Sequence, residues 1–133
     1  MVRDLEKAMG YYKLVGIGPR IIDNKVDTIF VKTSSRRLKP KVLSSIARFG
    51  DIEFEVVQPL EGMSFQKELL GKRGEGSFYI IEKSDNYNSK KAEMIDKGFL
   101  ILSEEELKDT EAGELCYFDT CEYGGVTWAT SDI

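Results

Sequence analysis

The stretch GDIEFEVVQP, residues 50–59, alternates apolar and acidic side chains over most of its length. Successive side chains of a strand point to opposite faces. One face then holds Ile52, Phe54 and Val56, and the other holds Glu53, Glu55 and Val57. The β-branched and aromatic residues favour a strand, and Pro59 ends it because proline cannot donate to a ladder. We expect the apolar row to lie against helices, and the acidic row to face either solvent or the inside of a curved sheet.

The first half of the chain predicts one helix followed by three strands. Asp4 is placed to cap a helix that runs to about Val15, where Gly16 ends it. Strands are predicted over residues 21–33, around a turn at Asp23-Asn24, over residues 42–49, and over the stretch quoted above. A short helix over residues 61–72 and a linker over residues 71–76 follow.

The second half predicts a strand, a helix and three more strands. These are a strand at 77–82, a helix at 85–97 begun near Asn86 or Asn88, and strands at 99–103, 114–119 and 125–131. The acidic segment SEEELKDTEAG, residues 103–113, is predicted as a solvated loop or frayed helix. The two halves therefore have the same order of elements, except that the first lacks an opening strand.

Five short motifs in this order carry a family resemblance. They are DLEKAMGYY at 4–12, GIGP at 16–19, FEVVQPL at 54–60, GEG at 74–76 and GGV at 124–126. Together they resemble the vicinal oxygen chelate superfamily, which includes glyoxalase I, bleomycin-resistance proteins, extradiol dioxygenases and methylmalonyl-CoA epimerase. The epimerase-like branch is the most similar.

The resemblance implies an α+β fold in which paired βαβββ modules form a curved mixed sheet around a cup. We expect a single domain over residues 1–133, with module one at about 1–60, the linker and short helix at 61–76, and module two at 77–133. The sequence begins at Met1, where the family's first strand would already be ending. We expect that strand to belong near the middle of the sheet, so that its absence leaves a gap in the pairing.

The metal site of the family's enzymes is mostly lost in this chain. Of the four ligand positions that the resemblance implies, the first falls on the missing strand. The second falls on Glu55, the third on Tyr79 and the fourth on Ala129, and only Glu55 is a competent ligand. The chain has no histidine, which also excludes Ser-His-Asp and Cys-His catalysis. We expect neither a bound metal nor another cofactor.

Strand alternation extends the cup beyond Glu55. It places on the inner face Glu53, Glu55, Tyr79, Ile81, Thr127 and Ala129, and on the helix-packed face Phe54, Phe78, Ile80, Val126 and Trp128. The predicted ligand-binding residues are Glu53, Glu55, Tyr79, Thr127 and Ala129, and no catalytic residue is assigned. The Glu55–Tyr79 pair is open to three interpretations: a structural hydrogen bond, a ligand-binding pair, or a general base beside a small acid.

Composition excludes several classes of partner. The net charge of −4 and the pI near 5.0 disfavour nucleic acid. No apolar stretch approaches the ~20 residues that span a bilayer, and no signal peptide is seen, so a cytoplasmic location and free thiols at Cys116 and Cys121 are expected. The basic run KTSSRRLKPK, residues 32–41, is either a solvated loop or a grip for an anion such as a phosphate or a coenzyme A tail.

Three functions remain open from the sequence. The first is a glyoxalase- or bleomycin-resistance-like protein that holds a small organic ligand, with anionic ligands among the candidates, in a cup with a degenerate metal site. The second is a metal-dependent epimerase or lyase of the methylmalonyl-CoA epimerase type, represented by a shortened chain. The third is a non-catalytic structural dimer. A homodimer is expected in any case, because a second copy would cover the unpaired strands beside the gap.

Overall fold

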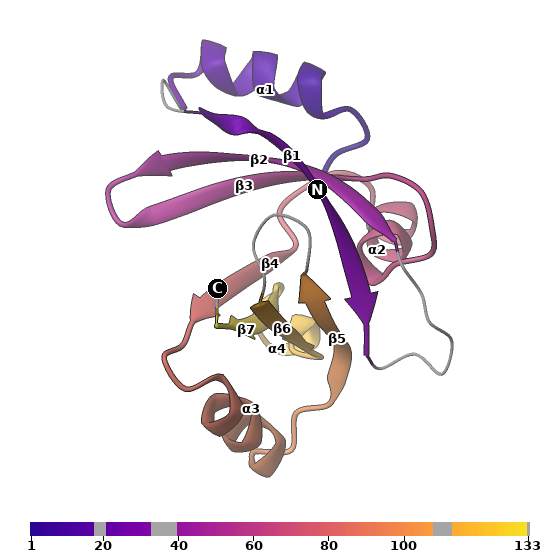
Figure 1. Cartoon of the computed structure of the whole chain (residues 1–133), viewed down its shortest axis with the longest axis vertical. Helices are drawn as coiled ribbons and strands as arrows, with labels where there is room; N and C mark the ends of the chain where they lie inside the picture. Colours follow the sequence, from indigo (N-terminus) through magenta and orange to yellow (C-terminus); the bar gives the residue numbers. More distant parts are fainter. Residues whose placement is uncertain (18–20, 33–39, 108–112, 133) are drawn as a thin grey trace.

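A single curved sheet organises the described residues, which in this computed structural model are 1–17, 21–32, 40–107 and 113–132. Its strands follow the order β3-β2-β1-β5-β6-β7-β4 (Figure 1). Their bounds are β1 Ile21–Val31, β2 Lys41–Phe49, β3 Ile52–Pro59, β4 Tyr79–Lys83, β5 Ile101–Leu107, β6 Gly113–Phe118 and β7 Thr127–Ser131. The helices are α1 Leu5–Leu14, α2 Phe65–Arg73, α3 Tyr87–Asp96 and the single turn α4 Cys121–Gly124.

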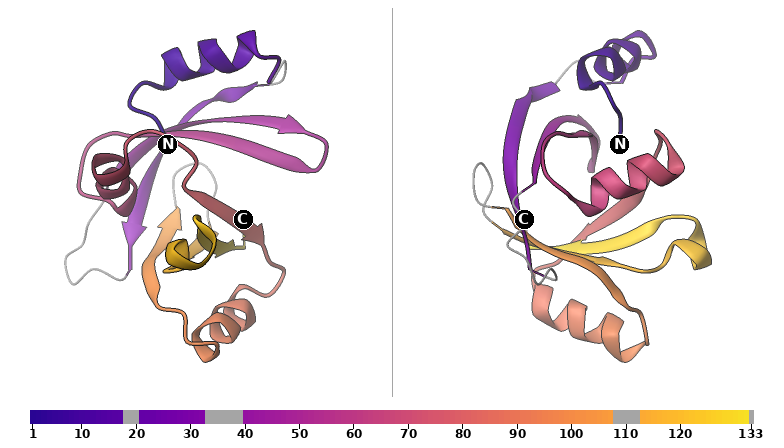
Figure 2. Two further views of the ribbon diagram at one scale, coloured as in Figure 1. Left: turned by 180° about the vertical axis from the view of Figure 1, so that it is seen from behind. Right: turned by 90° about the vertical axis from the view of Figure 1, so that its right-hand side faces the viewer.

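The sheet is built from two halves with related topology, which confirms the α+β fold of paired modules. The first half is α1-β1-β2-β3 and the second is β4-α3-β5-β6-β7. The halves join where β1 and β5 pair antiparallel, from Ile29 opposite Leu107 to Val31 opposite Glu105. The sheet curls about this joint, so that α2 lies on its concave side and α1 and α3 lie outside (Figure 2).

The place of the missing strand follows from comparing the halves. In the second half β4, the opening strand, pairs in parallel with β7, the last strand. The equivalent slot in the first half lies beside β3, at the end of the sheet. The backbone of Met1–Arg3 occupies part of it: Val2 N–H donates to the Val57 carbonyl at 2.9 Å, and Met1 and Gly76 exchange hydrogen bonds of 2.7 and 3.2 Å. The predicted position near the middle of the sheet is therefore wrong, because the seven strands pair as one continuous sheet.

Two further predictions about strands are corrected. Asp23-Asn24 does not form a turn, because β1 runs unbroken through it with a register shift between Ile22 and Lys25. The acidic segment 103–113 is neither loop nor frayed helix over residues 103–107, which form most of β5. Pairing with β1 and β6 overrides the low strand propensity of glutamate there. Residues 108–112 lie outside the described residues.

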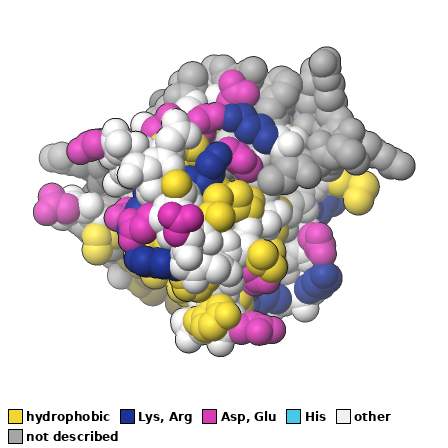
Figure 3. Space-filling model, turned by 90° about the horizontal axis from the view of Figure 1, so that it is seen from below, with side chains coloured by type: hydrophobic (Ala, Val, Ile, Leu, Met, Phe, Trp, Pro, Cys, Tyr) yellow, Lys and Arg dark blue, Asp and Glu magenta, His cyan; other side chains and the backbone are white. Residues whose placement is uncertain are grey.

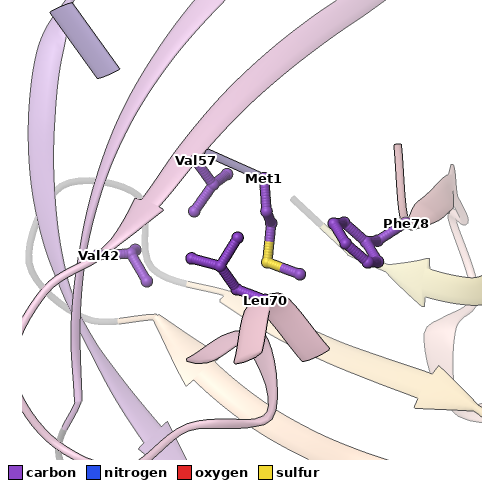
Figure 4. Packing of buried hydrophobic residues seen from close by; sticks show 5 residues of the cluster. All are labelled: Met1, Val42, Val57, Leu70 and Phe78. Atoms are coloured by element: carbon purple, nitrogen blue, oxygen red, sulfur yellow. The ribbon is translucent and has the colours of Figure 1, made fainter. Parts of the chain in front are cut away.

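The helices bury apolar side chains on both sides of the sheet. The Asp4 carboxylate caps α1 by accepting from the Lys7 N–H at 2.9 Å, and Leu5 and Met9 pack against Val56 on the outer face. Asn86 caps α3, which packs Tyr87 and Met94 against the outer face of β6. On the concave side, Leu70 of α2 joins a buried cluster with Met1, Val42, Val57 and Phe78 (Figure 4). This last cluster closes one end of the concave side and leaves the rest open.

Candidate functional site

A cleft of about 1700 Å³ opens on the concave side of the sheet. The two end strands of the sheet, β3 and β4, both line it, and Tyr11 and Tyr12 of α1 also belong to its lining. Its inner end reaches Gln66 of α2, Glu105 of β5 and Tyr117 of β6. The cleft is therefore the cup that the sequence predicted, bounded by both halves of the chain.

The structure brings three of the five predicted ligand-binding residues to the cleft. Glu53 and Glu55 line it from β3 and are exposed, and Tyr79 lines it from β4 and is half-buried. Thr127 and Ala129 lie behind this lining with exposed fractions of 1% and 0%, on the strand beside β4. The ligand-binding role of all five stays a prediction.

The predicted helix-packed face is correct in part. Trp128 packs into the cluster under α3, and the Phe54 ring meets the Tyr12 ring of α1 edge-on at 5.0 Å. Phe78, by contrast, is buried against Met1 and Leu70 on the concave side. Phe78 precedes the first residue of β4, so the alternation of the strand does not fix the side on which its ring lies. Ile80 is 49% exposed on β4, the strand that ends the sheet. Val126, the fifth, is half-buried.

The inner end of the cleft has a buried polar floor centred on Glu105. The Glu105 side chain is 0% exposed, and both of its oxygens accept from Gln66 Nε2, at 3.2 and 3.0 Å. Ser103 Oγ donates to the same carboxylate at 3.1 Å. Burial raises the pKa of Glu105 to about 7, although the bonds from Gln66 and Ser103 act to lower it. A carboxyl group with such a pKa exchanges its proton near neutral pH.

Two tyrosines stand beside this floor. The rings of Tyr79 and Tyr117 meet edge-on at 5.3 Å, and Gln66 Nε2 also reaches the Tyr117 hydroxyl at 3.5 Å. Burial raises the pKa of both phenols, and the nearby charges of Glu55 and Glu105 raise them further. Both hydroxyls therefore remain protonated at neutral pH and can donate hydrogen bonds. Two hydrogen-bond donors therefore lie near the carboxylates of Glu55 in β3 and Glu105 in β5.

Sequence reasoning missed Ser103, Glu105, Gln66 and Tyr117. The sequence placed Ser103 at the boundary between a predicted strand and the acidic segment, and placed Glu105 in a loop or frayed helix. Ser103, Glu105 and Leu107 nevertheless alternate with Glu104 and Glu106. Tyr117 lies in the run LCYF, residues 115–118, which is apolar on both faces and gives no sign of which side chain points inward. No pattern in the neighbouring sequence distinguishes Gln66, because its contact with Glu105 depends on the position of α2 relative to the sheet.

The described residues hold no group of three or more His, Cys, Asp or Glu side chains placed to bind a metal ion. Cys116 and Cys121 are free thiols. Burial raises the pKa of Cys116 to about 11, and Cys121 accepts from the Arg73 guanidinium at 3.0 Å. Neither thiol is among the described residues that line the cleft.

The basic run at residues 32–41 was predicted as a solvated loop or an anion-binding segment. Most of it, residues 33–39, lies outside the described residues. Its two ends pair with carboxylates: Lys32 with Glu114, and Lys41 with Glu61 at 2.8 Å. On the face seen in Figure 3, the described acidic, basic and hydrophobic side chains are interspersed. No helix among the described residues is both long and apolar enough to cross a membrane.

Solved structures with the same arrangement of elements identify the fold. A Streptomyces coelicolor methylmalonyl-CoA epimerase variant in complex with 2-nitronate-propionyl-CoA matches with a TM-score of 0.65 and 16% identity, over 98% of this chain and 89% of that chain. The Mycobacterium tuberculosis methylmalonyl-CoA epimerase matches with a TM-score of 0.66 and 14% identity, over 98% and 81%. The chain has the glyoxalase-like fold of these epimerases. At the level of the fold, this confirms the predicted resemblance.

Other comparisons limit what the glyoxalase-like fold implies here. A hypothetical protein from Bacillus halodurans matches with a TM-score of 0.57 and 19% identity, over 83% of this chain and 94% of that chain. Neither a protein-family profile nor a curated protein sequence matches this chain. At these identities the likeness extends to the fold, and the chemistry of the cleft has to be argued from its own residues.

Proposed function

We propose that this glyoxalase-like protein binds a small organic ligand in its cleft without a resident transition metal. The observation that carries the proposal is the cleft itself, which combines apolar walls with a polar floor. Val42, Ile46 and Phe78 line its walls, and Glu105, Gln66 and the two tyrosines supply the floor. A concave, mostly apolar site with a few converging polar groups is the usual form of a small-molecule pocket.

The residues at the family's ligand positions support a metal-free cleft. Glu55 could coordinate a metal, but a phenol at Tyr79 and a methyl group at Ala129 replace two further ligands. Catalytic zinc sites use three protein ligands, and the phenol of Tyr79 is held protonated because burial raises its pKa. Tyr79 is better suited to donate a hydrogen bond to a ligand oxygen.

The experiment is a thermal-shift screen of a metabolite library, followed by titration calorimetry on the hits. We expect at least one compound to raise the melting temperature, because a ligand that binds only the folded state stabilises it. Ile81→Trp should abolish the effect, because Ile81 lines the cleft and is 38% exposed. Ile95→Trp is the matched control, since Ile95 is 46% exposed on α3. Binding that survives Ile81→Trp unchanged would contradict the proposal.

A second candidate is a metal-dependent epimerase or lyase, which the likeness to the epimerases favours. It requires the missing ligands to come from a segment outside this sequence. An assay of methylmalonyl-CoA epimerisation with added Co²⁺ separates the two candidates. The metal-free proposal expects no turnover above background.

A further inference from the structure

We propose that the floor of the cleft receives a protonated amine, which donates to Gln66 Oε1 and forms an ion pair with Glu105. The inference rests on the proposed function and names the chemical class of its ligand: a small organic cation with an ammonium group. The glyoxalase-like fold does not determine which charged residues lie at the floor of the cleft, so the ligand class is inferred from the residues of this chain.

An unsatisfied acceptor at the floor points to a missing donor. Gln66 is 2% exposed, and its Nε2 is already used by Glu105 and Tyr117. Its Oε1 is buried and has no hydrogen-bond partner in the described structure. A buried acceptor without a partner costs about 1–3 kcal/mol. Since Oε1 belongs to the amide that contacts Glu105, a donor that satisfies it lies beside that carboxylate.

The surroundings of Glu105 favour a donor that carries positive charge. Its hydrogen-bond partners among the described residues, Gln66 and Ser103, are both neutral. Among the side chains that the structure describes, the titratable groups of the other elements at the floor are the Tyr79 phenol from β4, the Tyr117 phenol from β6 and the Glu55 carboxylate from β3. None of these can neutralise Glu105. A buried carboxylate is stabilised by a paired cation, whereas a ligand carboxylate would be repelled by both glutamates.

The protonation of Glu105 couples the site to pH. When Glu105 is protonated, its O–H can donate to Gln66 Oε1 after the amide rotates, and no ligand donor is required. When Glu105 is ionised, Oε1 needs an outside donor and the carboxylate needs a cation. Because burial places the pKa of Glu105 at about 7, both states are populated near neutral pH. The ammonium group therefore binds the ionised form, and its affinity rises as pH rises through 7.

The test uses three probes of the same shape: benzylamine, benzyl alcohol and benzoate. Their affinities are measured by titration calorimetry on the full chain at pH 6 and pH 8. Benzylamine stays protonated over this range, because alkylamines titrate well above it. We expect benzylamine to bind more tightly than the other two, and about tenfold more tightly at pH 8 than at pH 6, because the ionised fraction of a group with a pKa near 7 rises about that much.

Two variants isolate Glu105. Glu105→Gln should remove the pH dependence and weaken benzylamine at pH 8 to the affinity seen at pH 6 or below. Glu106→Gln is the matched control, since it makes the same change one residue along β5, on the opposite face. It should leave both affinities unchanged. Circular dichroism confirms that each variant is folded.

Other outcomes overturn the inference. Benzoate or benzyl alcohol binding at least as tightly as benzylamine would defeat the ammonium site, and so would a benzylamine affinity equal at the two pH values. Failure of all three probes to bind at millimolar concentration would also defeat it. If library compounds still bind and Ile81→Trp blocks them, the proposed function stands and only the choice of ligand class fails.

Discussion

Gln66 of α2 donates through Nε2 to both carboxylate oxygens of Glu105 in β5, at 3.0 and 3.2 Å. The two residues are 39 positions apart in the sequence: Gln66 lies in the helix that connects the two halves, and Glu105 lies in the second half. These hydrogen bonds link α2 to the concave face of the sheet. The two side chains also form part of the inner end of the cleft. The stability of the chain and the chemistry of its cleft are thus linked through one buried carboxyl group.

Stability should fall as pH rises through the titration of Glu105. Folding raises the pKa of this carboxyl from its ordinary 4.5 to about 7, so the folded state holds a proton that the unfolded state has lost between these values. The unfolded state binds fewer protons there, and the free energy of unfolding decreases with pH. From pH 5 to pH 8 we expect a loss of about 2.5 kcal/mol relative to Glu105→Gln, measured by urea denaturation.

The Glu106→Gln variant controls for the other titrating groups. It makes the same chemical change one residue along β5, on the opposite face of the strand. A wild-type curve parallel to that of Glu105→Gln over pH 5–8 would show that Glu105 keeps an ordinary pKa.

The two faces of β3 should differ in their sensitivity to mutation. Phe54→Ala removes the ring that meets Tyr12 at 5.0 Å. Because Phe54 is half-buried, we expect a loss of about 2 kcal/mol, below the roughly 3–5 kcal/mol for a fully buried phenylalanine. Glu55→Ala should cost under about 0.5 kcal/mol, since its side chain is exposed in the cleft. Equal shifts of the denaturation midpoint would mean that the faces are reversed.

Purified protein should contain no stoichiometric transition metal. The chain has no histidine, and of the family's ligand positions only Glu55 could coordinate a metal. Elemental analysis after expression with supplemented nickel, cobalt and zinc should find each well below one equivalent. A near-equimolar amount of any of them would refute the metal-free cleft.

A homodimer at micromolar protein concentration remains expected, for a revised reason. The slot beside β3 is at one end of the sheet and β4 is at the other, and each of these end strands exposes an apolar side chain: Ile52 of β3 at 64% and Ile80 of β4 at 49%. Exposed apolar side chains beside a sheet edge favour self-association. Ile80→Glu should therefore give a folded monomer by sedimentation velocity, whereas Ile95→Glu on α3 should not. A monomeric wild-type protein would rule the dimer out.

The fold was predictable because its signals are local and repeated. The alternation in residues 50–59, the Asp4 cap and the order of elements in the two halves each specify a local structure. Together they leave few topologies. The position of the missing strand was mispredicted, because it depends on which strands the two halves use to join, here β1 and β5.

The cleft was predictable on one strand and hidden on others. Glu53 and Glu55 lie on a strand whose other face is apolar, so the sequence distinguishes the two faces. Glu105 lies in an acidic run that resembles a solvated segment, and its burial is imposed by α2 and by pairing with β6. Sequence patterns assign a residue to the surface or the core by how often its type is found there. Glutamate is usually exposed, so a buried glutamate such as Glu105 is assigned wrongly.

The most direct test of the ligand cleft is the carboxyl ¹³C chemical shift of Glu105, followed by NMR during a benzylamine titration at pH 7. The free protein should show a shift between the protonated and ionised values, because its pKa is about 7. Saturation with benzylamine should move the shift to the ionised value, while the signal of Glu106 stays in place. A Glu105 signal that is fully ionised in the free protein, or that does not move at saturation, would contradict the account.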